Sequence, residues 1–290
     1  MIVDCHTHVN FATDEVGRSE HLAAAGPVDV CIVLAGAEGP GDETNKKLAD
    51  YVGKHKSKMV GFAVVDPTED KVSVSNLRSI KEKMGLKGCV LYCPACGFHP
   101  ANSRAMRFYE SAMELKLPVF FHNGYPVPQR DAVLEYAQPY LLDEVARTFG
   151  ELKIVVGGMG SPFVEQTLAL AAKHENVYAD LTVRPRCVWQ TYNTVVAAHE
   201  QGIMNKLLFG SGFPLSTAGQ CIETLLGLNM LLADTNLPTV PRNNIRNIIE
   251  RDTLGLLGIE HEGPEAGGST GEMAREREKD KAQEAEETED

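Results

Sequence analysis

Short apolar runs rich in β-branched residues alternate with helical segments along most of the chain, and this alternation constrains the fold more than any other feature. Eight runs have the length and composition of strands: residues 2–5, 28–34, 59–65, 89–91, 119–121, 154–156, 177–180 and 207–209. Continuously apolar strands are typical of parallel sheets, because both faces of such sheets are covered. Eight strand–helix units in about 258 residues match the size of a (β/α)8 barrel.

Segments with helical apolar spacing separate most of these runs. The clearest predicted helices span residues 44–55, 103–115 and 163–173, and Ser103 is the expected N-cap of the second. Residues 243–258 close the series as a last apolar helix. An open, doubly wound sheet is the alternative architecture, but no G-x-G-x-x-G fingerprint follows the first strand. We therefore predict an α/β fold of the (β/α)8 TIM barrel type.

The charge of the chain changes sharply after residue 258. The formal net charge is −12, and residues 259–290 hold 12 acidic and 4 basic side chains, whereas residues 1–258 hold 28 and 24. A segment so rich in charge cannot bury enough apolar surface to offset the entropy lost on ordering. We therefore predict one barrel domain over 1–258 and an acidic disordered tail over 259–290. The acidic balance also argues against nucleic-acid binding, which requires a positive field.

The N-terminus and the cysteines indicate a cytoplasmic protein. No basic segment followed by an apolar core begins the chain, and no apolar run approaches 18 residues, so neither a secretory signal nor a membrane span is expected. Seven scattered cysteines are an odd number, which favours free thiols in a reducing cytoplasm over a disulfide framework. Cys93 and Cys96 form a single CxxC, which lacks the two further ligands of a zinc site.

Two histidines end the first predicted strand, in the sequence D-C-H-T-H that begins at Asp4. Alternate side chains of a strand face the same side, so His6 and His8 both point toward the mouth of a barrel. His122 follows the fifth predicted strand and would enter the same mouth. The sequence therefore predicts a three-histidine metal site with an open coordination position, the arrangement that catalytic zinc uses.

An ordered set of motifs resembles the amidohydrolase superfamily, in the branch that includes the aminocarboxymuconate-semialdehyde decarboxylase-like enzymes. The motifs are H-T-H at 6–8, GFAVVDP at 61–67, GCVLY at 88–92, GFHP at 97–100, PVFFHNG at 118–124, KIVV at 153–156, NVYADL at 176–181, LFGS at 208–211 and LGLLG at 254–258. The resemblance covers nearly all of residues 1–258. It implies a (β/α)8 barrel, in agreement with the strand count.

The resemblance also implies a function. In this family the first-strand pair and the fifth-strand histidine bind a catalytic divalent metal, so His6, His8 and His122 are the expected ligands and zinc is the expected ion. The expected activity is that of a metal-dependent hydrolase or carboxy-lyase acting on a small molecule. Dimers are common among similar barrels, so a homodimer is a further expectation.

Two positions depart from the family pattern. The family has a general acid/base histidine after the sixth strand and a metal-binding aspartate after the eighth, and the matching residues here are Gly158 and Gly212. Val90 stands where related binuclear members have a bridging lysine, which excludes a carboxylated-lysine bridge. Losing the proton donor typically lowers a rate by about 10²–10⁴-fold, and losing a negative ligand weakens metal binding.

Other polar residues near the ends of the predicted strands are candidates for the site. Asp180 and Asp66 are candidate catalytic carboxylates. Asp4 is expected to orient the ring of a metal-binding histidine by accepting its N–H. The candidate substrate-binding residues are Asn123, Arg184 and Arg186. Either arginine could bind a carboxylate group of the substrate.

Three functions stay open at this point. The first is a metal-dependent hydrolase or carboxy-lyase with an atypical site. The second is a degenerate, catalytically inactive barrel that binds a small molecule or a protein. The third is a thiol-based activity of Cys93 or Cys96. The amount of metal bound to the purified protein would separate the first function from the others.

Overall fold

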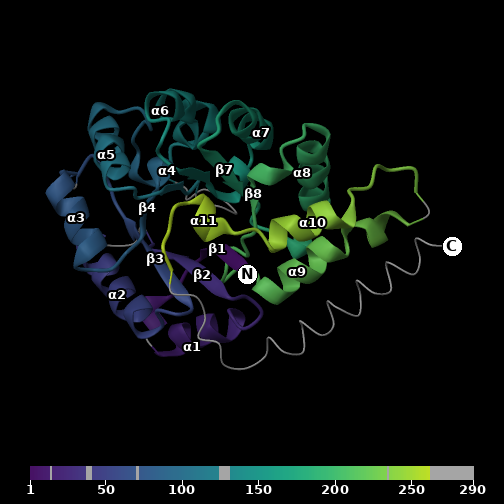
Figure 1. The fold of residues 1–290 in the computed structure, drawn as a ribbon, viewed down its shortest axis with the longest axis horizontal. Coiled ribbons are helices and arrows are strands. Elements are labelled where there is room, and N and C mark those ends of the chain that lie inside the picture. The colour runs from purple at the N-terminus through teal and green to yellow at the C-terminus, as the bar shows by residue number, and fades with distance from the viewer. Residues whose placement is uncertain (14, 37–40, 70–71, 124–130, 234, 262–290) are drawn as a thin grey trace.

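The computed structural model describes residues 1–13, 15–36, 41–69, 72–123, 131–233 and 235–261, and its centre is one eight-stranded parallel sheet. Each strand pairs with the next one along the chain (Figure 1). The strands are β1 (Val3–Thr7), β2 (Val30–Leu34), β3 (Met59–Val64), β4 (Gly88–Leu91), β5 (Val119–Phe121), β6 (Ile154–Val156), β7 (Val177–Asp180) and β8 (Leu207–Leu208). All their residues are buried, which explains why most of them are apolar.

Hydrogen bonds between β1 and the segment after β8 join the two edges of the sheet, which forms a nearly closed barrel. The N–H of Cys5 donates to the carbonyl of Phe209, and the N–H of Gly212 donates to the carbonyl of His6, both at 2.9 Å. The strand order and this closure confirm the predicted TIM barrel. They exclude the open, doubly wound sheet, whose strand order reverses at a switch point.

Helices surround the barrel and fill the connections between strands (Figure 1). The α-helices are α1 (Glu15–Ala24), α2 (Gly41–Lys54), α3 (Val74–Glu82), α4 (Cys93–Cys96), α5 (Ser103–Glu114), α6 (Asp143–Thr148), α7 (Val164–Lys173), α8 (Val188–Glu200), α9 (Ala218–Leu226), α10 (Arg242–Ile249) and α11 (Thr253–Leu256). The 3-10 turns are η1 (Phe11–Thr13), η2 (Leu134–Ala137), η3 (Pro139–Leu142), η4 (Gly157–Gly160), η5 (Pro185–Cys187), η6 (Met204–Lys206) and η7 (Leu228–Leu232).

The predicted and observed elements agree closely. All eight predicted strands are present, and their ends differ from the prediction by two residues at most. The three helices predicted between strands correspond to α2, α5 and α7. The predicted cap of α5 is wrong by one residue, because the side chain of Asn102, not Ser103, accepts the N–H of Arg104 at 2.9 Å. Asparagine and serine are comparably good N-caps, so the sequence alone did not distinguish the two.

The predicted last helix, 243–258, is divided into α10 and α11. The division occurs because the Asp252 carboxylate accepts the N–H of Gly255 at 3.0 Å and so starts a new helix. Beyond α11 the side chain of Ile259 is buried, and its N–H donates to the carbonyl of Leu254 at 2.9 Å. The barrel therefore continues slightly past residue 258. The predicted tail lies outside the described residues from 262 onward.

The cysteines and the helices also bear on the expected environment of the protein. All seven cysteines are free thiols, as predicted. Across the described ranges, no helix has both the length and the apolar character needed to cross a membrane.

Candidate metal centre

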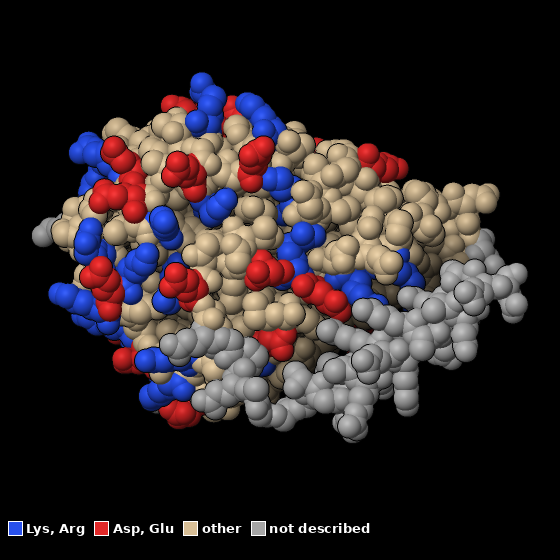
Figure 2. All heavy atoms as spheres, viewed as in Figure 1, with Lys and Arg blue, Asp and Glu red and all other residues tan. Residues whose placement is uncertain are grey.

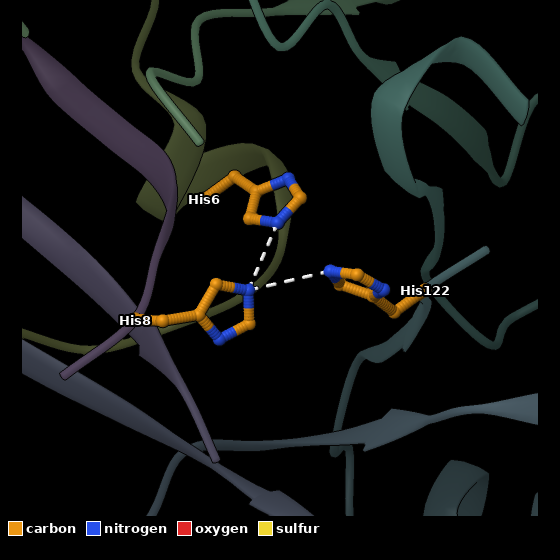
Figure 3. Close-up of side chains that lie close together, drawn as sticks. All are labelled: His6, His8 and His122. Carbon is orange, nitrogen blue, oxygen red and sulfur yellow. Dashed lines mark hydrogen bonds between the residues drawn. The ribbon is translucent and has the colours of Figure 1, made fainter. Parts of the chain in front are cut away.

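Three histidine side chains meet at the mouth of the barrel, at the carboxyl ends of strands. His6 lies in β1, His8 follows it by two residues, and His122 comes directly after β5 (Figure 3). The Nε2 atoms of His6 and His8 are 3.2 Å apart, and those of His8 and His122 are 3.3 Å apart. This is the one group of three or more potential metal-ligating side chains found among the described residues. The structure thus brings together the three predicted ligands.

The opposite ring nitrogens of His6 and His8 fix which atom carries the proton. The Nδ1 of His8 lies 3.1 Å from the carbonyl oxygen of Leu34, which can only accept, so this nitrogen donates. The Nδ1 of His6 lies 2.6 Å from a carboxylate oxygen of Asp180 and donates in the same way. A neutral imidazole has one N–H, so Nε2 of His8 keeps a lone pair that points toward the other two rings. A lone pair in this position is available to a cation held between the rings.

Burial keeps these rings in the form that binds metal. Burial, followed by the nearby His6, lowers the pKa of His8 to about 3. The same two causes, with His8 in addition, hold the pKa of His122 well below its usual range. Both rings are therefore neutral at physiological pH, and only a neutral imidazole can donate its lone pair to a metal ion.

Asp180, at the end of β7, holds His6 in place. Its carboxylate accepts a hydrogen bond from the His6 ring. It also accepts hydrogen bonds from the N–H of Gly158 at 2.9 Å, from the N–H of Thr182 at 2.9 Å and from the Thr182 hydroxyl. Burial alone would raise the pKa of Asp180, but His6 and these hydrogen bonds outweigh it and lower the pKa. Asp180 is therefore an anion that orients the ring of His6, in the way that carboxylates commonly orient the histidines of metal sites.

Asp4 does not make the ring contact predicted for it. Its carboxylate accepts the backbone N–H of His6 at 3.2 Å and that of Ser211 at 2.9 Å, so it joins β1 to the segment after β8. Burial raises its pKa to about 6, although the hydrogen bonds from Ser211 oppose this shift. Asp180 makes the ring contact instead, because β7 ends level with His6 whereas Asp4 lies one layer lower on the same strand as His6.

Thr182 is a contributor that the sequence analysis missed. Its hydroxyl lies 3.0 Å from Nδ1 of His6 and donates to Asp180. Its φ of 38° is in the left-handed region, which is unusual for a β-branched residue. The sequence held one indication of this role. An aspartate often accepts the N–H of the residue two positions later, as Asp180 does here from Thr182.

Gly158 and Gly212 contribute to this network through their backbones. Gly158 has a φ of 55° and donates its N–H to Asp180, and Gly212 has a φ of 64° and donates its N–H to the carbonyl of His6. A Cβ at Gly212 would lie 2.8 Å from Cγ2 of Thr182. The left-handed conformation and this close approach both favour glycine at position 212.

A cavity of about 240 Å³ opens beside this network, where β6 and β7 end. Gly158 and Thr182 line this cavity. They are also the residues that bond to Asp180 and to His6, so they connect the cavity wall with the histidine cluster. The remaining wall combines hydroxyl, amide, charged and aliphatic side chains: Met159, Ser161, Pro162, Val164, Glu165, Leu181, Arg184, Gln190, Thr191, Asn193 and Thr194. Arg184 is the one basic residue of this lining, and its guanidinium donates to Gln190 at 2.7 Å.

The other predicted site residues make contacts elsewhere. The carboxylate of Asp66 accepts the N–H and the hydroxyl of Thr68, at 2.8 and 2.6 Å. The amide nitrogen of Asn123 donates to the carbonyl of Ala137 at 2.9 Å and so holds η2. Arg186 is exposed. Of the three predicted substrate-binding residues, Arg184 is the one that lines the cavity.

The Cys93 thiol of the CxxC motif has the wrong environment for nucleophilic catalysis. It is buried, and burial, followed by the neighbouring Cys96, raises its pKa well above the usual range. Thiol chemistry requires the thiolate, which this environment disfavours. Cys93 is therefore a poor nucleophile, whereas Cys96 is half-buried.

Comparison with known proteins agrees with this geometry. A sequence profile of the amidohydrolase family matches residues 3–238. Three similar solved structures each cover 89% of this chain. They are a probable 2-pyrone-4,6-dicarboxylic acid hydrolase from Acinetobacter baumannii with citric acid bound (15% identity, TM-score 0.64, 99% of that chain), a 2,6-dihydroxybenzoate decarboxylase from Rhizobium (15%, 0.61, 98%) and a 5-carboxyvanillate decarboxylase from Novosphingobium aromaticivorans with bound manganese (11%, 0.62, 97%). No curated protein sequence matches the chain significantly.

The solved structures and the profile support conclusions at different levels. At 11–15% identity the structures show that the fold is shared. The alignments include 97–99% of the other chains and 89% of this one. The profile match spans most of the chain and includes all three histidines of the metal centre. The resemblance predicted from the ordered motifs is thus confirmed, and the chain belongs to the amidohydrolase family.

Proposed function

We propose that the protein is a metal-dependent hydrolase or carboxy-lyase that acts on a small carboxylated molecule. One observation carries this proposal. The Nε2 atoms of His6, His8 and His122 converge, while Nδ1 of His6 and of His8 is engaged as a donor. Three converging ring nitrogens, with the His8 and His122 rings neutral, are suited to holding a cation.

The donor set fits a divalent transition metal, and we propose zinc. Three imidazole nitrogens with an open position are the ligands of catalytic zinc in other enzymes, and nitrogen donors suit zinc better than magnesium or calcium. A metal bound there supplies a Lewis acid that polarises a substrate oxygen. The manganese of the similar 5-carboxyvanillate decarboxylase makes manganese the first alternative to test.

The chain's own residues position the substrate and the ligands. Asp180 and Thr182 orient the His6 ring, and we propose that Arg184, which lines the adjoining cavity, binds a substrate carboxylate there. Position 158 offers a backbone N–H and no side chain, so we propose that solvent supplies the proton that the family histidine would supply. A rate about 10²–10⁴-fold below that of an enzyme with a positioned acid follows.

A second candidate function is favoured by the same two glycines. We propose that Gly158 and Gly212 stand where the family has its proton-donating histidine and its metal-binding aspartate, so that the site lacks both groups. A barrel that binds a metal and a small molecule without turning it over would have this site. The seven free thiols support a reducing compartment for either function, and we propose the cytoplasm.

The metal content of the purified protein tests the metal centre. We expect close to one zinc or manganese per chain in the wild type and almost none in the His6→Ala/His8→Ala variant. Asp180→Asn should weaken metal binding by about 10–100-fold, because it removes the anion that orients His6. Asp66→Asn is the matched control and should bind metal as the wild type does. Absence of metal from wild-type protein grown with zinc, manganese or iron would overturn the proposal.

Turnover separates the two candidate functions. Metal-loaded protein would be incubated with aromatic carboxylates and with carboxylated lactones, and carbon dioxide and ring opening would be measured. Turnover that is lost in the His6→Ala/His8→Ala variant supports the enzyme, and Arg184→Gln should then raise KM more than it lowers kcat. Stoichiometric metal with ligand binding but no turnover would identify the binding barrel.

A further inference from the structure

Tyr92 is a buried residue at the mouth of the barrel that the proposed function does not use. It follows β4 directly, and its ring packs against the ring of His122. The two ring centroids are 4.7 Å apart, and the ring planes are inclined by 36°. His6 and His8 meet the same His122 ring at the steeper angles of 77° and 70°. The two imidazoles therefore meet His122 edge to face, whereas Tyr92 is partly stacked on it.

The phenol hydroxyl fixes Tyr92 to the segment that ends and follows β2. It donates to the carbonyl of Ala35 at 2.8 Å, and the N–H of Ala35 donates in turn to the carbonyl of Phe62 in β3 at 3.0 Å. The preceding residue, Leu34, is the last of β2, and its carbonyl accepts the Nδ1–H of His8 at 3.1 Å. Two consecutive carbonyls therefore hold one ring of the histidine cluster and the phenol that packs against another.

The main chain places His122 but leaves the orientation of its ring to packing. The N–H of His122 donates to the carbonyl of Leu91, the last residue of β4, at 2.8 Å. Rotation of a histidine ring about its bond to Cβ has only a broad preference, so the contacts of the ring decide its direction. Because Tyr92 directly follows Leu91, the bond that places His122 also sets its ring beside the phenol.

We propose that Tyr92 is a positioning residue, which orients the ring of His122 toward the other two histidines. This inference rests on the proposed metal centre. An ion held by three nitrogens requires three lone pairs that point at one position, so a ring that can turn away binds the ion less tightly. Residues 34–35 then couple two of the three ligands, His8 directly and His122 through the phenol.

Substitutions of Tyr92, compared with the same substitutions of Tyr109, test the inference. Tyr109 is a matched control because it is also a buried phenol whose hydroxyl donates to a main-chain carbonyl, that of Pro100 at 2.9 Å, and it lies outside the histidine cluster. Each tyrosine would be replaced by phenylalanine, which keeps a ring, and by leucine, which does not. Urea unfolding of the metal-free proteins would compare their stabilities.

Metal binding would be measured with zinc and cobalt ions alone. Dissociation constants would come from competition with a chelator, and the visible spectrum of bound cobalt would report the geometry of its ligands. Exposed acidic side chains, which can bind metal weakly, are scattered among basic ones over the face shown in Figure 2. The His6→Ala/His8→Ala variant measures this surface background, which would be subtracted.

We expect Tyr92→Leu to weaken metal binding by about 10-fold or more and to change the cobalt spectrum, because the His122 ring loses its support. Tyr92→Phe should bind within about 3-fold of the wild type, because the stacked ring is kept. Both Tyr109 variants should keep the affinity and the spectrum, although Tyr109→Leu should lower stability as Tyr92→Leu does. A folded Tyr92→Leu with wild-type affinity and spectrum, or an equal loss of affinity in Tyr109→Leu, would overturn the inference.

Nuclear magnetic resonance of the metal-free wild type provides a measurement that does not depend on how the variants fold. We expect nuclear Overhauser contacts between the ring protons of Tyr92 and His122, whose centroids are 4.7 Å apart, and their absence would also overturn the inference. Wild-type protein that binds neither zinc nor cobalt would overturn the proposed function and this inference together. Binding by the wild type that Tyr92→Leu leaves unchanged would overturn this inference alone.

Discussion

At the residue scale, the histidine cluster at the barrel mouth depends on one carboxylate, Asp180, which accepts several hydrogen bonds. Asp180 accepts hydrogen bonds from His6, from Thr182 and from the N–H of Gly158. The left-handed conformation of Gly158 directs its N–H at the carboxylate. A residue without a side chain thus contributes to the site through its main chain.

A second buried histidine near this centre makes stability depend on pH. His21, in α1, accepts or donates one hydrogen bond with the Tyr51 hydroxyl at 2.7 Å, and its Nε2 is buried without a hydrogen-bond partner. Burial, followed by His55, lowers its pKa to about 4. Between this value and the unfolded value of about 6.5, the unfolded chain binds the extra proton, so stability falls as pH falls through this window.

Replacing His21 should flatten this dependence. Between pH 7 and pH 4.5 the free energy of unfolding of the wild type should fall because His21 resists protonation. We expect this fall to be about 2–3 kcal/mol smaller in His21→Gln. Urea unfolding of both proteins at the two pH values measures the difference. An equal loss in wild type and variant would show that His21 does not stay neutral in the folded protein.

At the scale of elements, the sequence specifies the strands better than the connections. Continuous apolar runs are dictated by burial on both faces, so all eight strands are predicted nearly to their ends. The break between α10 and α11 was missed because it depends on the Asp252 side chain turning back to cap a helix, and the apolar spacing continues across it. His6, His8 and His122 were found because each follows or ends a strand, whereas Thr182 meets His6 only through the fold, because the two are 176 residues apart in the sequence.

The contact between α2 and β3 shows how one polar side chain can join two elements. Asn45 is buried, and its amide donates to the carbonyl of Val64 at 2.9 Å and accepts its N–H at 2.8 Å. We expect Asn45→Ala to lower the free energy of unfolding by about 2–4 kcal/mol, because it leaves both backbone groups of Val64 buried without partners. Lys46→Ala, at the exposed next position of α2, should change it by about 0.5 kcal/mol or less. Urea unfolding gives both values, and similar losses in the two variants would contradict this account.

At the scale of the whole molecule, the barrel brings distant parts of the chain to one mouth. Strands β1, β5, β7 and β8 all end there, so residues from 6 to 212 in the sequence form one connected site. The parallel barrel makes this automatic, because the carboxyl ends of all its strands lie on one face. The site residues are spread along the chain, whereas the acidic residues are concentrated at its end: 11 of the 40 follow residue 261.

Two truncations can locate the end of the folded barrel. Removal of 262–290 takes away 11 acidic and 4 basic residues, and we expect it to change the thermal midpoint by about 2 °C or less, because so charged a segment has little apolar surface to bury. Removal of 259–290 also deletes Ile259, which is buried and bonded to Leu254. Its loss should cost about 1.5–3 kcal/mol and lower the midpoint by about 3–10 °C. Calorimetry of both chains measures the difference, and a large decrease already in the first truncation would show that residues beyond 261 pack against the barrel.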